Sequence, residues 1–328
     1  MYRTKILGSG SYFPTKRITN DDLAKTIDTN NEWIVERTGI RARHVAEPGT
    51  PTSELAKFAS QKALESAGTS PEEIEMILFA TGTADYSMPN TACILKEKLG
   101  IPIAGALDVT AACSGFLYAL SLANSLIKAG HYKKILVVGA ETLSTIINWE
   151  DRTTCILFGD GAGAFVVGRA SDSDQSQIYS SHLYADGNMA EFLITPAGGS
   201  AKPATPELIK NKEHLVQMKG KEIFKVAVRM LSDSSNEALK ANGFTIDDVN
   251  WFVPHQANLR ILEAVAKRLN FPLEKTIVTL EEYGNTSAAT IPTSFDTAVR
   301  DGRIKRGDLV LAAVFGGGLT WGSTLFRY

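Results

Sequence analysis

One segment of this chain occurs twice. The sequence KALESAGTSPEEIEMILFA, residues 62–80, aligns without gaps with EALKANGFTIDDVNWFVPH, residues 237–255, so that one constant offset carries Gly68 to Gly243. Both copies predict a helix that ends at this glycine, followed by an acidic turn and a buried strand. Because there is one long period and no short one, the repeat indicates a duplicated domain rather than a solenoid.

A second pair of segments extends the duplication. The strand-like run KKILVVGAE, residues 133–141, aligns with GDLVLAAVF, residues 307–315, at an offset one residue shorter than the first. Strands alternate with helices in each copy, which favours an α/β fold with helices on both faces of largely parallel sheets. The polar connector SDSDQS, residues 171–176, separates the copies. We therefore expect two halves, residues 1–172 and 173–328, related by a pseudo-two-fold axis.

Residues 106–130, ALDVTAACSGFLYALSLANSLIKAG, place a cysteine between a strand and a helix. The first four residues predict the end of a buried strand, and small residues then turn the chain into Cys113. From Ser114 onward apolar residues recur at helical spacing until Gly130. At the start of such a helix, unpaired backbone N–H groups and the helix dipole favour the thiolate, which is the nucleophilic form. The alternative for this cysteine is a small packing residue.

The duplication places two further polar residues near this turn. The counterpart of Cys113 is Ala288, which lies in the segment YGNTSAAT close to Asn285, and His255 directly follows the strand WFV. Ligand sites in α/β sheets gather at the carboxyl ends of strands, so we expect Cys113, His255 and Asn285 to meet. Taken singly, such a histidine is usually structural and such an asparagine belongs to a turn. Their combination with Cys113 favours catalysis.

Charge and cysteine content argue against several classes of protein. The formal net charge is −2, which gives no indication of a nucleic-acid partner. Cys93, Cys113 and Cys155 are odd in number and far apart, which argues against disulfides or a zinc site and for a reducing compartment. No apolar run approaches membrane-spanning length, and the N-terminus lacks a signal-peptide core. We therefore expect a cytoplasmic protein without a bound metal, in which Cys93 and Cys155 serve as packing residues.

Six motifs resemble those of the thiolase-superfamily condensing enzymes. They are DTNNEWIVERTGIRARH, ACSGF, ILFGDGAGA, VPHQANLRI, YGNTSAA and FGGGLTWG, and they follow the family's order along nearly the whole chain. Within the superfamily they are most similar to the β-ketoacyl-acyl carrier protein synthase III family, the initiating condensing enzymes of dissociated (type II) fatty-acid synthesis. The resemblance implies the duplicated five-layer αβαβα thiolase fold. It also implies an acyltransferase that needs no cofactor beyond its substrates, an acyl-coenzyme A and malonyl-acyl carrier protein.

The resemblance assigns roles to the residues already singled out. Cys113 would accept the acyl group, and His255 and Asn285 would donate hydrogen bonds beside it. The backbone N–H groups of Cys113 and Gly317 would form an oxyanion hole. The chemistry calls for these residue types in any case, because joining two thioesters requires a covalent acyl carrier. Decarboxylation of a malonyl thioester also builds negative charge on the thioester oxygen, which hydrogen-bond donors must stabilise.

The resemblance also implies a binding site for coenzyme A. Trp33 and Arg152 would stack on the adenine, and Arg37 would meet the phosphates. Thr29 and Asn258 would make further polar contacts. Without the family, these residues would be interpreted as a partly buried tryptophan and ordinary surface side chains. The segment GDGAG, residues 159–163, is too weak a match to a phosphate loop to indicate a nucleotide cofactor.

The second substrate would arrive on acyl carrier protein, which is strongly acidic. Two helices that the sequence predicts carry basic residues on their polar sides, and in the family these positions form the docking surface. The predicted surface consists of Lys225, Arg229, Arg260, Lys267 and Arg268. The alternative for such charges is an ordinary solvated helix face.

The resemblance further assigns an acyl pocket to Leu157, Phe158, Phe315 and Met88. Met88 stands where acetyl-preferring relatives usually carry phenylalanine, and in the family this residue comes from the partner subunit of a homodimer. Methionine is slimmer and more flexible, which puts a strict preference for acetyl groups in doubt. The loop at residues 198–214 is rich in Gly, Pro and Lys and predicts an exposed segment near the pocket mouth.

Three alternative functions remain at this point. A tailoring synthase on the same scaffold would use a longer or unusual acyl starter in specialised metabolism. A hydrolase with the same cysteine, histidine and asparagine would release free acid without a malonyl substrate. A non-catalytic subunit of this fold would ordinarily lack the nucleophile, which this chain retains. The preferred acyl group is left open.

Overall fold

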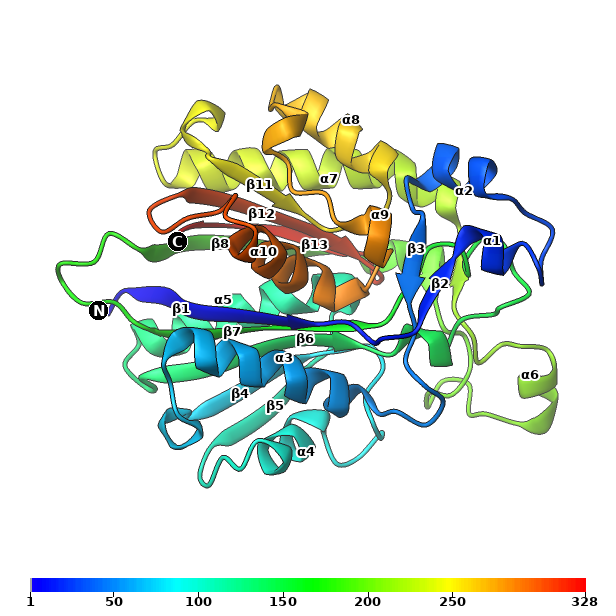
Figure 1. Cartoon of the computed structure of the whole chain (residues 1–328), viewed down its shortest axis with the longest axis horizontal. Helices are drawn as coiled ribbons and strands as arrows, with labels where there is room; N and C mark the ends of the chain where they lie inside the picture. The colour runs from blue at the N-terminus through cyan, green and yellow to red at the C-terminus, as the bar shows by residue number, and fades with distance from the viewer. Residues whose placement is uncertain (1) are drawn as a thin grey trace.

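The protein is built from two mixed sheets that enclose a pair of helices (Figure 1). The computed structural model describes residues 2–328. The first sheet consists, in spatial order, of β1 (Thr4–Tyr12), β7 (Gly161–Arg169), β6 (Lys134–Glu141), β4 (Met76–Ala80) and β5 (Gly105–Val109). The second consists of β11 (Trp251–Pro254), β12 (Leu309–Gly316), β13 (Thr320–Arg327) and β8 (Gln177–Ala185).

Three pairs of helices complete five layers (Figure 1). Between the sheets lie α5 (Gly115–Lys128) and α10 (Thr290–Arg300). The first sheet is covered on its outside by α3 (Thr52–Ala67) and α4 (Thr91–Lys98), and the second by α7 (Gly220–Ala241) and α8 (Leu259–Leu269). Each helix pair buries its apolar face against the neighbouring sheet. The five-layer αβαβα fold expected from the sequence is therefore confirmed.

Most strands of each sheet run in one direction, as the sequence pattern indicated, and each sheet also contains one strand that runs the opposite way. In the first sheet β4 pairs in parallel with β5 and β6, whereas β7 runs antiparallel to β6 and to β1. In the second sheet β11, β12 and β8 run the same way, and β13 runs antiparallel to its two neighbours β12 and β8. Alternation of strands and helices predicted the crossover connections correctly. It did not reveal direct strand-to-strand connections such as the short turn from β12 to β13.

Equivalent elements of the two halves keep the offset that carries Gly68 to Gly243. For example, α5 begins at Gly115 and α10 at Thr290, and β6 begins at Lys134 and β12 at Leu309. The sequence alignment of this strand pair had instead matched Lys134 with Asp308, so it is wrong by one residue. A shift of one residue turns every side chain to the opposite face of its strand, which is why the buried faces specify the register. The predicted division at residue 172 falls between β7 and β8 and stays a prediction.

The two halves differ at the edges of their sheets. Strand β5 forms one edge of the first sheet, and alternate residues along it are exposed, so it is not the fully buried strand that the sequence predicted. Its counterpart in the second half is reduced to a single bridge between Phe252 and Thr276. The first sheet therefore ends in an unpaired strand, with open backbone hydrogen-bonding groups along its outer side.

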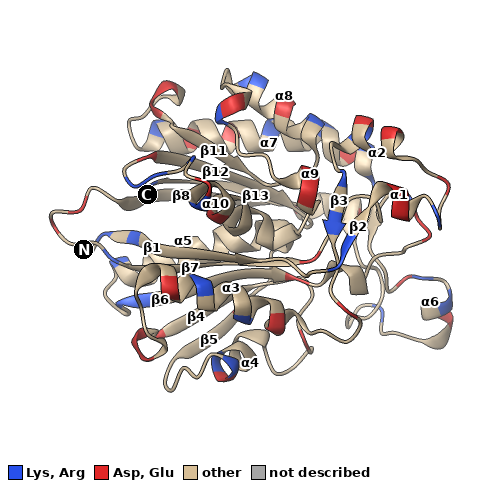
Figure 2. Cartoon of the chain, viewed as in Figure 1, with Lys and Arg blue, Asp and Glu red and all other residues tan. Residues whose placement is uncertain are grey.

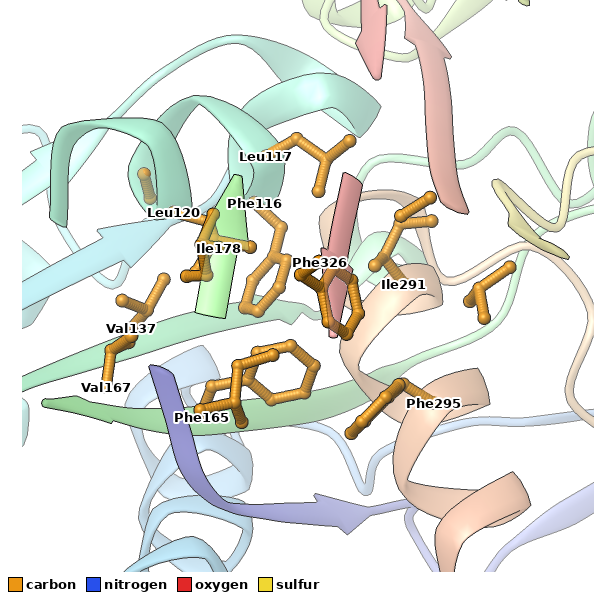
Figure 3. Close-up of a cluster of buried hydrophobic side chains, with 14 of the residues drawn as sticks. Phe116, Leu117, Leu120, Val137, Phe165, Val167, Ile178, Ile291, Phe295 and Phe326 are labelled. Atoms are coloured by element: carbon orange, nitrogen blue, oxygen red, sulfur yellow. The ribbon is translucent and has the colours of Figure 1, made fainter. Parts of the chain in front are cut away.

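The central layer is held by large apolar side chains. Phe116 on α5 and Phe165 on β7 are fully buried, with ring centroids 5.0 Å apart and the rings nearly perpendicular (Figure 3). Phe295 on α10 lies 4.9 Å from Phe165 on the other side. Burial of a phenylalanine side chain stabilises a fold by about 1.5–3 kcal/mol. Charged residues lie mainly on the outer helices and loops (Figure 2).

Short elements form a cap at one end of the layers (Figure 1). They are β2 (Arg17–Thr19), α1 (Asn20–Leu23), α2 (Asn31–Thr38), β3 (Ala42–His44), β9 (Leu193–Ile194), α6 (Pro206–Lys210), β10 (Gln217–Met218) and α9 (Leu280–Tyr283). The loop at residues 198–214 contains α6 and is tied down by ion pairs of Lys202 with Glu213 and of Lys212 with Glu150. Within residues 2–328, no helix combines the length and the apolar character needed to cross a membrane.

Candidate functional site

Cys113 lies on a short turn at the centre of the molecule. This turn, the 3₁₀ helix η2 (Ala112–Ser114), leads from β5 into α5. Ala112 has a φ of 46°, in the left-handed region that favours glycine. The second half repeats the turn as η7 (Ser287–Ala289), where Ser287 has a φ of 51°. The two turns contact each other, so the duplicated backbone meets where Cys113 lies.

The end of β12 packs directly against the Cys113 turn. A Cβ atom on Gly316 would lie only 2.8 Å from the backbone nitrogen of Cys113, so no larger residue permits this approach. The next residue, Gly317, lines the same cavity as Cys113, and the backbone N–H groups of both residues lower the pKa of the Cys113 thiol. The structure thus places together the two N–H groups expected to form an oxyanion hole, and that role stays a prediction.

Two cavities meet at Cys113. The outer cavity is bounded by α7, α8 and Leu157, and its wall contains His255 and Asn285 together with Cys113. The inner cavity lies on the other side of Cys113 and is mainly apolar; its wall includes Gly82, Glu141, Leu143, Ile146, Ile147 and Val216. Cys113, Phe158 and Leu193 line both cavities. The structure therefore brings together the three residues that the sequence analysis expected to meet.

His255 is held as a neutral ring with a defined tautomer. Its Nδ1 lies 2.7 Å from Oγ1 of Thr290, and that hydroxyl donates its only proton to the Ser287 carbonyl oxygen at 2.9 Å. Thr290 can therefore only accept from the imidazole, so Nδ1 carries the ring proton and Nε2 is an acceptor. Burial lowers the pKa of His255 to about 3. The sequence predicted that His255 donates a hydrogen bond, whereas Nε2 of the resting ring is arranged to accept a proton.

Asn285 presents its amide nitrogen to the outer cavity. Its Oδ1 accepts a hydrogen bond from the backbone N–H of Ser287 at 2.8 Å, so the Nδ2 protons are left to donate. Its backbone is paired with the cavity wall, because the Asn285 N–H donates to the Leu157 carbonyl oxygen at 2.8 Å and the Gly159 N–H donates to the Asn285 carbonyl oxygen at 3.0 Å. The arrangement is compatible with the donor role expected from the sequence.

Cys113 is a thiol in the resting site rather than the expected thiolate. Burial raises the pKa of the Cys113 thiol to about 11, and the negative charge of Glu141 acts in the same direction. The nearby Ser287 hydroxyl and the backbone N–H groups of Cys113 and Gly317 act in the opposite direction but do not cancel this rise. Desolvation outweighs the helix-start effect that the sequence analysis relied on. The reaction therefore needs a proton acceptor near the sulfur.

The sequence analysis missed the buried carboxylate of Glu141. It lies at the end of β6 and accepts hydrogen bonds from Thr83 Oγ1 at 2.6 Å, Ser287 Oγ at 2.9 Å and the Gly82 N–H at 3.0 Å. Burial raises the pKa of this carboxyl group. The repeat held a signal for it, because the offset that carries Cys113 to Ala288 makes Glu141 the counterpart of Gly316, which touches the Cys113 backbone.

Arg43 is a second residue that the sequence analysis did not single out. It is fully buried, and its guanidinium donates to the Ile156 carbonyl oxygen at 2.6 Å and to Asn20 Oδ1 at 2.9 Å. Burial lowers the pKa of Arg43 to about 10. Ile156 immediately precedes the segment that pairs with the Asn285 backbone. Arg43 therefore supports the wall on which Asn285 is mounted.

The residues assigned to coenzyme A lie together on the cap. The guanidinium carbons of Arg37 and Arg152 lie 4.5 Å and 5.1 Å from the centre of the Trp33 ring. A purine inserted between Arg152 and Trp33 needs about 7 Å, since each stacked contact takes about 3.5 Å. Arg152 is held only by contacts at 2.8 Å and 3.2 Å to the exposed Asp28. It would have to move outward to admit an adenine.

Thr29 and Asn258 are also placed at this end of the molecule. The Thr29 hydroxyl is buried and has no hydrogen-bond partner within residues 2–328. Asn258 lines the outer cavity, caps α8 through the Arg260 N–H at 2.9 Å, and donates to the Arg37 carbonyl oxygen at 2.9 Å. Asn258 thus joins the predicted coenzyme site to the cavity that leads to Cys113.

The residues assigned to the acyl pocket are divided between different places. Leu157 and Phe315 line the outer cavity, and Phe158 lines both cavities. Met88 lines neither and is 87% exposed.

The predicted docking residues for acyl carrier protein are all exposed on the two adjacent helices α7 and α8; they are Lys225, Arg229, Arg260, Lys267 and Arg268. Arg268 pairs with Asp233 at 3.2 Å.

Comparison with known proteins gives one consistent result. The family model described as 3-oxoacyl-[acyl-carrier-protein (ACP)] synthase III matches residues 107–187, and the one for its C-terminal part matches residues 239–328. Proteins named beta-ketoacyl-[acyl-carrier-protein] synthase III are similar along the whole chain. The one from Xanthomonas euvesicatoria is 50% identical over 99% of this chain and 98% of its own. The one from Thiobacillus denitrificans is 50% identical over 100% of both chains.

Solved structures agree with these sequence relatives. The crystal structure of 3-oxoacyl-[acyl-carrier-protein] synthase III from Aquifex aeolicus has a TM-score of 0.91 and 46% sequence identity. The match covers 99% of this chain and 100% of the other. The similarity therefore extends over both halves and both cavities.

The neutral His255 predicts a pH dependence of stability. The unfolded chain binds a proton at this position below its ordinary pKa of about 6.5, whereas the folded chain resists protonation down to about 3. Stability is therefore fully present above pH 6.5 and is lost as the pH falls. Between pH 7 and pH 5 we expect wild type to lose about 2 kcal/mol more unfolding free energy than His255→Gln. Urea denaturation at both pH values measures the difference.

A matched control is the exposed His131. The variant His131→Gln should keep the pH dependence of wild type. An equal loss of stability in wild type and in His255→Gln would contradict the assignment of a neutral buried imidazole.

Proposed function

The chain belongs to the 3-oxoacyl-[acyl-carrier-protein] synthase III family, and on that premise we propose how its own residues perform the family's reaction. Its function is that of the initiating condensing enzyme of fatty-acid synthesis, an acyltransferase. The alternative of a tailoring synthase is not favoured, because relatives that match over the full chain at about half identity carry the synthase III name.

In the first step, the Cys113 sulfur attacks the carbonyl carbon of the acyl-coenzyme A thioester. Because the resting group is a thiol, its proton has to leave, and Nε2 of His255 is the acceptor available in the same cavity. The backbone N–H groups of Cys113 and Gly317 stabilise the oxyanion that forms. When the bond to the coenzyme sulfur breaks, that sulfur leaves with the proton from His255. The acyl group then remains on Cys113.

In the second step, malonyl-acyl carrier protein enters the outer cavity and loses carbon dioxide. The electron pair of the broken bond forms an enolate, whose oxygen accepts a hydrogen bond from Nδ2 of Asn285. The enolate carbon attacks the acyl carbonyl and displaces Cys113 as a thiolate. One proton taken up from solvent restores the thiol. This proton can pass through Nε2 of His255. While Nε2 carries the proton, it is the second hydrogen-bond donor to the enolate oxygen, and it then releases the proton to Cys113.

One observation carries this proposal: Cys113, His255 and Asn285 line a single cavity with their reactive atoms already oriented. Fixed hydrogen bonds occupy Nδ1 of His255 and Oδ1 of Asn285. The remaining nitrogen of each side chain, Nε2 or Nδ2, is therefore left for the substrate. This preorganisation is what an enzyme needs to stabilise charge as it develops.

The substrates reach Cys113 from the cap. We place the coenzyme against Trp33, Arg37 and Arg152, with Thr29 and Asn258 as polar contacts, and the pantetheine arm in the outer cavity along Leu157, Phe158 and Phe315. The acyl chain would occupy the inner cavity, where the wall is mainly apolar. The reaction needs no cofactor beyond the two thioesters. Three cysteines without a pairing pattern fit a reducing, cytoplasmic setting.

A homodimer is the proposed assembly. The open edge strand β5 adjoins an exposed apolar surface that consists of Tyr86, Met88, Ile103 and Leu107. Ile103 is 88% exposed, which is unusual for so large an apolar side chain beside an unpaired strand. A second copy paired along β5 would cover this surface. Met88, which lines no cavity of its own chain, would then be free to close the inner cavity of the partner.

Acylation and condensation can be separated by intact-protein mass spectrometry. Wild type mixed with an acyl-coenzyme A should gain the acyl mass and lose it only when malonyl-acyl carrier protein is added. Cys113→Ala should gain no mass. Asn285→Ala should still be acylated, but discharge by malonyl-acyl carrier protein should slow by about 100-fold or more, because a donor to the enolate is lost.

Two outcomes would contradict these roles. Equal slowing of both steps in Asn285→Ala would remove the division between acylation and decarboxylation. Release of the acyl group by water alone, at the same rate as with malonyl-acyl carrier protein, would favour the hydrolase alternative.

Arg260 tests the proposed docking surface. It is exposed at the first turn of α8, next to Asn258 at the mouth of the outer cavity. Arg260→Glu should raise KM for malonyl-acyl carrier protein by about fivefold, a change on the order of 1 kcal/mol, and leave acylation by the coenzyme A thioester unchanged. Lys305→Glu, an exposed charge in the loop before β12, is the matched control. An unchanged KM in Arg260→Glu would make these charges ordinary surface.

The dimer proposal is tested by placing a charge at the edge of the first sheet. Ile103→Asp should convert the protein to a monomer in sedimentation velocity, since an unpaired charge opposes burial of this surface. Leu273→Asp changes an exposed leucine next to the second sheet and should leave the dimer intact. A monomeric wild type, or a dimer that survives Ile103→Asp, would overturn the proposal.

A further inference from the structure

Glu141 is a fully buried carboxylate for which the proposed reaction has no role. It faces the inner cavity beside Cys113, and both of its oxygens are occupied. The donors are the Thr81 hydroxyl at 3.2 Å, the Thr83 hydroxyl at 2.6 Å, the Gly82 N–H at 3.0 Å and the Ser287 hydroxyl at 2.9 Å. All four are uncharged. A carboxylate buried without a cation is costly, and it persists only where hydrogen bonds hold it in place.

Ser287 lies between this carboxylate and the nucleophile. It lines the inner cavity with Cys113 and Glu141, and its turn, η7, contacts the turn η2 that carries Cys113. A hydroxyl has a single proton to donate. While that proton points to Glu141, Ser287 can offer Cys113 only a lone pair, which accepts from a thiol and repels a thiolate. If the proton turned to the sulfur, the thiolate would be stabilised instead.

Two hydrogen bonds fix the backbone of Ser287. Its N–H donates to Oδ1 of Asn285 at 2.8 Å, and its carbonyl oxygen accepts from Thr290 at 2.9 Å. The backbone is therefore fixed, and only the hydroxyl torsion remains to decide which neighbour receives the proton. A carboxyl oxygen accepts a hydrogen bond more strongly than the sulfur of a thiol does, so the Ser287 proton points to Glu141.

We propose that Glu141 is a positioning residue that acts through Ser287 to keep Cys113 a thiol in the resting enzyme. The nucleophile is then released only when an acyl donor is in place and Nε2 of His255 takes the proton. Other electrophiles meet the less reactive protonated form. The titratable groups around the sulfur are Glu141 on β6 and His255 after β11; the remaining neighbours on η7 and in residues 81–83 are uncharged. This inference rests on the proposed nucleophilic role of Cys113.

The test measures how fast iodoacetamide alkylates Cys113 as a function of pH, with each cysteine resolved by peptide mass spectrometry. In Glu141→Gln the carbonyl oxygen can still accept from Thr83, which turns the amide NH₂ toward Ser287. Ser287 then accepts from the amide and gives its own proton to the sulfur. The pH midpoint of Cys113 alkylation should fall by about one unit, a roughly tenfold faster reaction below the midpoint. A merely structural role would lower the midpoint only by loosening the site and exposing the thiol, and it would then do so to the same extent in the Ser287→Ala background.

Two matched controls are available within the chain. Cys93 is exposed, so it is not the packing residue that the sequence predicted; it does not line the inner cavity, and its alkylation profile should be the same in every variant. Asp160 is another fully buried carboxylate, held by the Ala46 N–H at 2.8 Å and by Ser144. Asp160→Asn removes a buried charge without a link to Cys113, so the midpoint of Cys113 should stay at its wild-type value.

Ser287→Ala tests whether the effect passes through the hydroxyl. Alanine is compatible with this backbone, because the equivalent position of the first half is Ala112 at a nearly equal φ. The shift caused by Glu141→Gln should be much smaller in the Ser287→Ala background than in wild type. An equal shift in both backgrounds would mean that Glu141 acts by charge alone and would overturn the relay through Ser287.

Further outcomes decide against the proposal as a whole. An unchanged or higher midpoint in Glu141→Gln, or the same fall in Asp160→Asn, would overturn it. If Glu141→Gln does not fold, Glu141→Asp takes its place, because the shorter side chain withdraws from Ser287; it too has to lower the midpoint. Alkylation reports on the thiol directly, so loss of acyl transfer with a shifted midpoint would count against the proposed function and not against this inference.

Discussion

Ser287 fixes the orientations of the hydrogen-bonding groups around the nucleophile relative to one another. Its N–H orients the Asn285 amide, its carbonyl oxygen receives the proton of Thr290, and Thr290 in turn defines the tautomer of His255. Its hydroxyl reaches Glu141 on the other half of the molecule. Because one residue with a fixed left-handed backbone makes three of these bonds and is linked through Thr290 to the fourth, the donors and acceptors of the site cannot reorient independently of one another.

Duplication explains why such a residue exists. The same turn occurs twice, as η2 and η7, and the pseudo-two-fold arrangement brings the two copies into contact. The copies then differ in chemistry: the first provides Cys113 after Ala112, and the second provides Ala288 after Ser287. The strands beside them differ as well, with Glu141 in one half and Gly316 in the other. A symmetric scaffold thus holds an asymmetric site, with a nucleophile on one side and its hydrogen-bonding partners on the other.

Burial gives this site its protonation states. Desolvation raises the pKa of the Cys113 thiol and lowers that of His255, so the resting pair is neutral although a thiolate and an imidazolium would be the reactive ions. A neutral pair avoids the cost of two buried charges and leaves the proton transfer to the moment of attack. Glu141 is the exception, a buried carboxylate with a raised pKa that is surrounded by hydrogen-bond donors.

The sequence by itself determined the duplication, the five layers, the helix after Cys113 and the three residues that meet in the outer cavity, because periodicity, glycine stops and motif order are local or repeat regularly along the chain. It placed the β6 and β12 alignment one residue out, it did not reveal the single antiparallel strand of each sheet, and it predicted a thiolate. Only the tertiary structure decided these points. Register and strand direction depend on which faces are buried, and the charge of Cys113 depends on desolvation and on Glu141 and Ser287, residues that are distant along the chain and adjacent only after folding.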